Sequence, residues 1–130
     1  MTTNKNQQKE FRYSIIKSFG CAFYGIFIFF KNDFHGKIHL LAAVFVIFSG
    51  FLFRISQHEW LFILLCISIV MGSEMMNHAI EKLCDKVNPE WDDKIKIIKD
   101  VSAGMVLICS IFAATTGLII FIPRILKLLN

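Results

Sequence analysis

The stretch Val101–Ile122 reads VSAGMVLICSIFAATTGLIIFI, 22 residues without a charged side chain. A helix that crosses the hydrocarbon core of a membrane needs about 20 apolar residues, so this stretch is predicted to span a bilayer, with Pro123 and Arg124 marking its end. The whole chain agrees, because 55% of its 130 residues are hydrophobic and only 18% are charged. A water-soluble globule of this size needs more polar surface, and a disordered chain needs fewer apolar residues. We therefore expect an all-α membrane protein with a single domain over residues 1–130.

Two more segments have the composition of spanning helices. Hydropathy places the three spans at about 38–54, 59–87 and 99–122. The first of them is short, but Lys37 and Arg54 can extend their charged ends toward the headgroups. The second continues through charged residues until Asn88-Pro89, where proline disfavours helix at the preceding residue.

The segment of about 11–30 has a different pattern. Its early part places apolar residues at 11, 15, 19 and 23, the spacing of one helix face, and its other side is basic. Lys17 and Lys31 leave only Ser18–Phe30 uncharged, about 20 Å of helix. We therefore favour an amphipathic helix in the membrane surface, with a further spanning helix as the alternative.

The distribution of positive charge predicts the orientation. Six Lys or Arg lie at or before Lys37 and five more lie in 82–99, whereas the other side keeps only Arg54, Arg124 and Lys127. Positive residues are enriched in cytoplasmic segments. The N-terminus and the 82–99 segment are thus expected in the cytoplasm.

Four polar residues near the end of the second span form one stripe. At about 100° per residue, Glu74, Asn77, Glu81 and Asp85 fall within a sector of about 80°. Counted from Glu59, the stripe begins about 22 Å along the helix, inside a hydrocarbon core of about 30 Å, and ends among the headgroups. Carboxylates at such a depth are costly and by default mark a functional site. The alternative is that the acids only pair with basic residues or hold helices together.

Further charged residues fall at the same membrane level. Lys99 and Asp100 lie where the last span enters from the cytoplasmic side, and Asp33 lies just before the first span. Taken alone, Asp33 can be a helix cap and Lys99 a topology anchor. Together, carboxylates can hold Mg²⁺, a lysine can neutralise phosphate, and a desolvated glutamate can act as a base. These are the parts needed for phosphoryl transfer to a lipid alcohol.

Standard nucleotide motifs are missing from the chain. Gly20 and Gly25 have the spacing of a phosphate-binding loop, but Ile26-Phe27 follow in place of its lysine and hydroxyl residue. The competing class is a non-enzymatic membrane subunit with a proton or cation path along the acidic stripe. That class does not account for Lys99-Asp100 together with a stripe confined to one interface.

The stripe and the lysine motif resemble those of a known family, the small prokaryotic lipid kinases that comprise diacylglycerol kinase and undecaprenol kinase. The hallmark helix Glu-x-x-Asn-x-Ala-Ile-Glu-x-x-x-Asp is present as residues 74–85, and the Lys-Asp motif as residues 99–104. Residues 31–33 and 37–39 resemble the segment that precedes the family's first spanning helix. The resemblance covers about 11–122, nearly the whole chain.

The resemblance implies roles for individual residues. Glu74 would be the catalytic base on the lipid hydroxyl, and Asn77 would help to position it. Glu81 and Asp33 would hold the Mg²⁺ of ATP. The remaining implied contacts are Lys99 with the transferring phosphate and, with the nucleotide, Asp100, Glu90, Trp91 and Asp92.

The resemblance also implies partners and a location. It predicts a homotrimer in the bacterial cytoplasmic membrane, with active sites between protomers at the membrane interface, and no nucleic-acid partner. Two residues depart from the family pattern: Asp33 replaces a glutamate and His78 replaces a serine or threonine. The details at 37–39 and 103–104 look more like the undecaprenol kinase branch than the diacylglycerol kinase branch.

Overall fold

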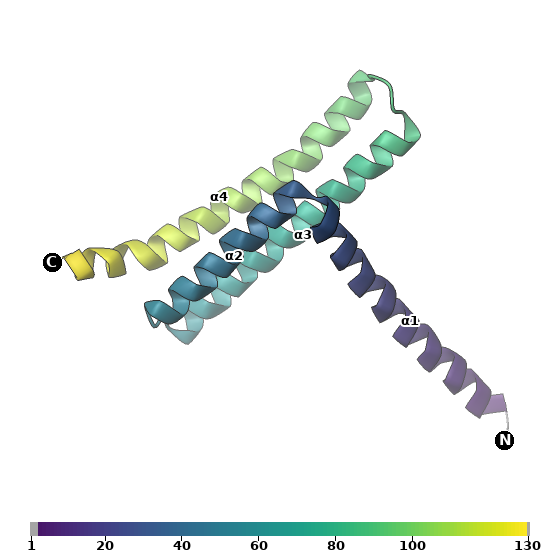
Figure 1. Ribbon diagram of the computed structural model, residues 1–130, viewed down its shortest axis with the longest axis horizontal. Helices are drawn as coiled ribbons and strands as arrows, with labels where there is room; N and C mark the ends of the chain where they lie inside the picture. Colours follow the sequence, from purple (N-terminus) through teal and green to yellow (C-terminus); the bar gives the residue numbers. More distant parts are fainter. Residues whose placement is uncertain (1–2, 130) are drawn as a thin grey trace. The chain divides into compact units, whose positions relative to one another are not determined.

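The computed structural model describes residues 3–129, with side chains described from residue 14 onward. It contains four α-helices: α1 (Thr3–Asn32), α2 (Phe34–Leu52), α3 (Gln57–Val87) and α4 (Asp93–Leu129). The chain divides into two compact units, residues 1–33 and residues 34–130. In the second unit α3 packs against α4 along its length and against α2 (Figure 1). The expectation of an all-helical protein is confirmed.

The first unit is the single helix α1. Its described side chains are mostly exposed and include several large apolar groups, such as Phe19, Phe23 and Phe27. Ser14–Asn32 is long and apolar enough to cross a membrane. The surface orientation proposed for about 11–30 therefore stays a prediction, and the side chains of Phe11 and Arg12 lie outside the described part.

Backbone hydrogen bonds in the turn between α2 and α3 end the helix α2. At the end of α2 the Ile55 amide donates to the Gly50 carbonyl and the Arg54 amide to the Phe51 carbonyl, each at 3.2 Å. This pair of bonds is the Schellman arrangement, which places the residue after the helix in the left-handed region. Arg54 takes that place with a φ of 49°.

A capping box starts α3. The Ser56 hydroxyl accepts the Glu59 amide at 3.4 Å, and the Glu59 carboxylate accepts the Ser56 amide at 2.7 Å. Two of the amides left unpaired at the start of a helix are satisfied in this way. The same carboxylate also accepts a hydrogen bond from Arg124 of α4 at 2.8 Å, so the ion pair ties the start of α3 to α4.

The predicted helix break at Asn88-Pro89 is confirmed. The helix α3 ends at Val87, and Asn88 has the extended backbone that a residue before proline prefers. Asp92 then starts α4, because its Oδ1 accepts the amides of Lys94 and Ile95 at 2.8 and 3.0 Å.

Pro123 and Arg124 mark the end of the predicted uncharged span but not of the helix that contains it. The helix α4 continues through Pro123 to Leu129, 37 residues in all. Proline inside a helix removes one backbone hydrogen bond, which membrane helices tolerate when nearby groups compensate. The amide that Pro123 lacks would have paired with the Ile119 carbonyl; one residue further on, the Arg124 guanidinium donates to the Ile120 carbonyl at 2.6 Å.

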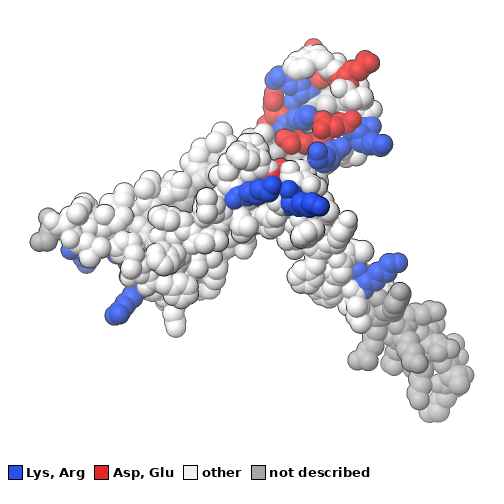
Figure 2. Space-filling model, viewed as in Figure 1, with Lys and Arg blue, Asp and Glu red and all other residues white. Residues whose placement is uncertain are grey.

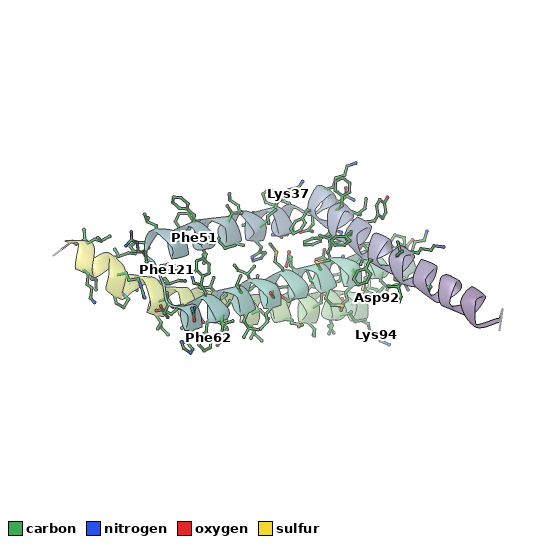
Figure 3. The ribbon with its side chains drawn as sticks, turned by 90° about the horizontal axis from the view of Figure 1, so that it is seen from below. Lys37, Phe51, Phe62, Asp92, Lys94 and Phe121 are labelled. Atoms are coloured by element: carbon green, nitrogen blue, oxygen red, sulfur yellow. The ribbon has the colours of Figure 1, made fainter. Side chains whose placement is uncertain are left out.

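The buried core lies at the end of the second unit where α2 joins α3, which we call the α2–α3 end. Ile55, Ile63 and Ile120 form its centre, and Phe53 and Trp60 pack around them. Figure 3 shows the aromatic residues Phe51, Phe62 and Phe121 at this end and Lys37, Asp92 and Lys94 at the other. Most other large apolar side chains remain exposed, and all four helices are long and apolar enough to cross a membrane.

Candidate active site

Charged side chains of the second unit gather where α3 meets α4, which we call the α3–α4 end (Figure 2). A polar cavity of about 330 Å³ lies there. The residues that line it come from the last turn of α3, the connecting loop and the first two turns of α4. They are Asp85, Asn88, Pro89, Glu90, Trp91, Asp92, Ile95, Lys96, Lys99 and Asp100.

The predicted stripe lies on one uninterrupted helix, and burial decreases along it. Glu74 is 4% exposed and Asn77 is 9% exposed, whereas Glu81 is half-buried and Asp85 is exposed. Glu74 thus lies in the packed, apolar part of α3, and Asp85 borders the polar cavity. The stripe connects a buried carboxylate to a polar pocket.

Two hydrogen bonds link the stripe to α4. The Ser102 hydroxyl donates to Asn77 Oδ1 at 2.6 Å, and Asn77 Nδ2 donates to Glu81 Oε1 at 3.3 Å. The amide of Asn77 therefore orients the Glu81 carboxylate and is itself held by Ser102. The packing of α4 against α3 thereby determines the direction of a carboxylate oxygen in the candidate site.

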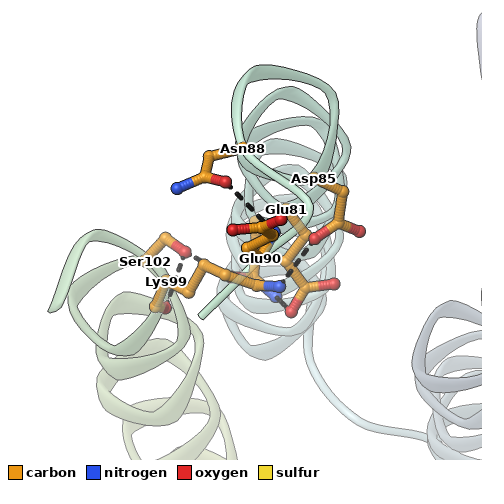
Figure 4. Close-up of polar contacts among 7 residues, drawn as sticks. Glu81, Asp85, Asn88, Glu90, Lys99 and Ser102 are labelled. Atoms are coloured by element: carbon orange, nitrogen blue, oxygen red, sulfur yellow. Dashed lines mark hydrogen bonds and ion pairs between the residues drawn. The ribbon is translucent and has the colours of Figure 1, made fainter. Parts of the chain in front are cut away.

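An ion pair joins the same two helices nearer the loop. Lys99 Nζ lies 2.9 Å from Asp85 Oδ1, and Figure 4 shows the lysine reaching from α4 toward α3 with Glu81 beside the pair. One turn earlier on α4, Lys96 pairs with the exposed Asp100. Lys99 and Asp100 both line the polar cavity. The structure therefore brings Lys99, Asp100 and Asp85 to one cavity, with Glu81 beside the Lys99–Asp85 pair; their common membrane level stays a prediction.

In the connecting loop some side chains stabilise the local backbone, and others lie on the wall of the polar cavity. The Asn88 side chain accepts the Glu90 amide at 3.1 Å, and the Asp92 carboxylate caps α4. Trp91 is 78% exposed, and its indole donates to Asp93 at 3.1 Å. Among the predicted nucleotide contacts, Asp92 thus has a local structural role, while Glu90 and Trp91 lie on the cavity wall.

The donor set is compatible with magnesium bound together with a nucleotide. Mg²⁺ is usually held by one or two carboxylates together with phosphate oxygens and waters. In the second unit Glu81 supplies one half-buried carboxylate. Asp33, the other predicted ligand, belongs to the first unit, where it is 8% exposed. Within the described residues no three His, Cys, Asp or Glu side chains form a metal cluster by themselves. Such a cluster is not needed for a metal that arrives with phosphates.

Sequence reasoning gave Ser102 no role. It lies three residues after Lys99 and therefore on the same face of α4. This spacing from Lys99, which was predicted at the membrane level of the stripe, was the available signal.

Comparison with known proteins identifies relatives. Residues 20–121 match the family model described as prokaryotic diacylglycerol kinase. The chain is 33% identical to an undecaprenol kinase of Bacillus subtilis (strain 168) over 109 residues, 84% of this chain and 89% of that protein. It is 29% identical to a diacylglycerol kinase of Synechocystis sp. (strain ATCC 27184 / PCC 6803 / Kazusa) over 117 residues, 89% of this chain and 67% of that protein.

The fold and these matches define the class of protein: a membrane-embedded lipid kinase, hence a transferase. The chain belongs to the prokaryotic diacylglycerol kinase family. The resemblance seen in the stripe and the Lys-Asp motif is thereby confirmed. The alternative of a non-enzymatic membrane subunit is wrong.

Proposed function

We propose that this chain transfers the γ-phosphoryl group of ATP to the hydroxyl of undecaprenol or diacylglycerol at the cytoplasmic membrane interface. Undecaprenol is the first candidate, because the details at 37–39 and 103–104 resemble that branch and a relative with this name covers 84% of the chain. The observation that carries the proposal is the path from buried Glu74 through Asn77 and Glu81 to the polar cavity with Lys99.

Glu74 is proposed as the base. It lies in the packed part of α3, where the lipid hydroxyl is proposed to approach from the membrane, and a carboxylate can take the hydroxyl proton as a general base. As the proton moves to Glu74, the lipid oxygen bonds to the γ-phosphorus and the bond from that phosphorus to the bridging oxygen breaks. ADP leaves with the bonding electrons, and the lipid phosphate remains in the membrane.

The other residues are proposed to position the metal and the nucleotide and to neutralise the charge of the phosphates. Asn77 orients Glu81, and Glu81 with Asp33 would hold Mg²⁺, which offsets the charge of the ATP phosphates when bound. When ATP binds, the Lys99 ammonium would leave its ion pair with Asp85 and contact the transferring phosphate instead. Asp100, Glu90, Trp91 and Asp92 are proposed to contact the nucleotide from the walls of the cavity.

The proposal includes the assembly and its orientation. We infer that the protein is a homotrimer in the bacterial inner membrane, with the N-terminus and the α3–α4 end in the cytoplasm. The count of basic residues supports this orientation: eleven Lys or Arg on the proposed cytoplasmic side, six up to Lys37 and five in 82–99, against three on the other.

The test is magnesium-dependent phosphorylation of undecaprenol and of diacylglycerol by the purified protein in lipid. Glu74→Gln is expected to fold and bind ATP but lose turnover, because an amide cannot take the hydroxyl proton. Glu59→Gln is the control for loss of a structural carboxylate of the same helix: it removes the ion pair with Arg124 and is expected to lower stability but not turnover. Near-normal turnover of Glu74→Gln would refute the base, and no phosphorylation of either lipid by the unmodified protein would refute the function.

A further inference from the structure

The polar cavity at the α3–α4 end has a second lysine, to which the proposed mechanism gives no role. Lys96 lines the cavity together with Lys99, and the two are three residues apart on α4, so they are neighbours on the helix surface. Among the described residues that line the cavity, four are acidic: Asp85, Glu90, Asp92 and Asp100. Negative charge therefore exceeds positive charge on the wall, although the proposed substrate is a polyphosphate.

Each lysine of the cavity has an acidic partner. Lys99 Nζ lies 2.9 Å from Asp85 Oδ1, and Lys96 Nζ is paired with Asp100 Oδ2. All four of these residues line the cavity. The two ammonium groups that could bind a phosphate chain are thus occupied by carboxylates of the protein itself.

The pair between Lys96 and Asp100 can be exchanged at little cost. The two side chains are 51% and 61% exposed, and ion pairs with such exposure contribute little to stability. An acid four residues after a lysine is also the less stabilising order on a helix. A lysine in the first turn of a helix is opposed by the helix dipole as well. A phosphate, which carries more negative charge than a carboxylate, can therefore replace Asp100 as the partner of Lys96.

The position of Lys96 along α4 matches the course of a phosphate chain. Lys99 lies closer to Ser102, whose hydroxyl is bonded to Asn77 of the stripe, and Lys96 lies closer to the connecting loop. The two residues are separated by about 4.5 Å along the helix axis. The flexible stems of both lysines can bridge such a step to adjacent phosphates. With the γ-phosphate at Lys99, the next phosphate lies at the level of Lys96.

From this arrangement we propose that Lys96 is a second phosphate-binding residue, which leaves Asp100 and contacts the β-phosphate when a nucleoside di- or triphosphate enters the cavity. The inference rests on the proposed function, because it assumes that the γ-phosphate lies at Lys99. The exchange also releases the Asp100 carboxylate, which can then accept hydrogen bonds from the ribose hydroxyls. Lys96 binds the nucleotide, whereas Lys99 stabilises the phosphoryl group that is transferred.

Three substitutions test the proposal. Lys96→Met removes the charge and keeps an apolar stem, and Lys96→Arg keeps the charge. Lys94→Met is the matched control, because Lys94 is an exposed lysine of the same helix turn that does not line the cavity. Lys96 is exposed as well, so none of the three changes alters the packed part of the protein.

The first readout is nucleotide binding without lipid substrate, measured by calorimetry in neutral detergent with Mg²⁺. Lys96→Met is expected to raise the Kd for ATP and for ADP about tenfold, the effect of losing one hydrogen bond to a charged group. The Kd for AMP, which has no β-phosphate, is expected to change less than twofold. Lys96→Arg and Lys94→Met are expected to stay within threefold of the unmodified protein for all three nucleotides. Equal weakening of ATP, ADP and AMP together with a lower melting temperature would make Lys96 a structural residue and overturn the proposal.

The second readout is the kinetics of lipid phosphorylation. Lys96→Met is expected to raise the KM for ATP about tenfold and to change kcat less than threefold, since it weakens binding of the substrate and not the chemical step. An unchanged KM for ATP would overturn the contact and keep the proposed function. ADP binding that depends on Lys96, in a protein that phosphorylates neither lipid, would refute the function and keep the contact.

A lipid headgroup is the other source of phosphate at a membrane interface. Vesicles of phosphatidylcholine with and without phosphatidylglycerol separate the two sources. The effect of Lys96→Met on the Kd for ADP is expected to be the same in both. A Kd for ADP that Lys96→Met leaves unchanged, with activation by phosphatidylglycerol lost, would assign Lys96 to a headgroup and overturn the proposal.

Discussion

Ser102 of α4 donates its hydroxyl to Asn77 of α3 at 2.6 Å, and both residues are buried. The same hydroxyl also lies 2.9 Å from the Lys99 carbonyl, and Asn77 Nδ2 is directed to Glu81. The orientation of a proposed metal ligand thus depends on a residue of another helix. Ser102 is a positioning residue, since it acts through Asn77.

We expect Ser102→Ala to lower kcat about tenfold and to raise the Mg²⁺ concentration needed for half-maximal activity, because Asn77 loses the donor that holds it. Ser102→Thr keeps the hydroxyl and is expected to restore both values. The measurement is a magnesium titration of lipid phosphorylation for the three proteins. Equal curves for Ser102→Ala and the unmodified protein would mean that the bond only packs the helices.

The ion pair between Lys99 and Asp85 leads to a second prediction. Lys99→Ala is expected to reduce the rate on the order of 10²-fold, because the transferring phosphate loses its positive partner. Lys94→Ala is the control, since Lys94 is a nearby exposed lysine of the same helix and is expected to change the rate less than threefold. A similar small effect at Lys99 would reduce this residue to a topology anchor.

Periodicity predicted the acidic stripe because residues on one helix depend only on the helix repeat. Contacts between helices depend on how the helices pack, which a single sequence does not determine. Ser102 was therefore not assigned a role, although Asn77 was. The continuation of α4 beyond the predicted span was not foreseen, because proline usually ends a helix.

Gly50 is predicted to be essential for the close packing of α2 on α3. A Cβ at this position would lie 2.7 Å from the Trp60 ring and 3.1 Å from Ile55 Cδ1. We expect Gly50→Ala to destabilise the protein by about 1–3 kcal/mol through overpacking. Thermal unfolding in detergent measures this, with Gly117→Ala as the control, because that position is open and alanine favours helix. A Gly50→Ala protein as stable as the parent would show that Trp60 moves aside freely.

The orientation of α1 can be tested at Phe23, which is 70% exposed. If α1 lies in the membrane surface, Phe23→Asp puts a charge on its apolar face and is expected to increase cleavage of the N-terminal segment by added protease. Tyr24→Asp is the comparison on the neighbouring position. Unchanged cleavage and unchanged activity of Phe23→Asp would contradict the surface orientation.

The proposed metal pair departs from the family pattern at Asp33. Mg²⁺ requires near-octahedral oxygen ligands at about 2.0–2.1 Å and readily keeps waters. An aspartate is one methylene shorter than the usual glutamate, so a bridging water or a small backbone shift can make up the reach. Asp33 is the single residue between α1 and α2, and its amide donates to the Phe29 carbonyl at 2.8 Å. The backbone amide of Asp33 is therefore held by the last turn of α1.

From this difference we predict the magnesium dependence of four proteins. Asp33→Asn and Glu81→Gln should each raise the Mg²⁺ requirement sharply, because each removes one negative ligand. Asp33→Glu should preserve or increase activity, since it restores the longer reach. The measurement is ATP turnover in lipid as a function of Mg²⁺ for these variants and the unmodified protein, with ATP affinity measured separately. An Asp33→Asn curve that overlays that of the unmodified protein would mean that Asp33 is a helix cap only. Glu81 would then need a different carboxylate as its partner in binding Mg²⁺, and Asp85 lies one turn away on the same helix face.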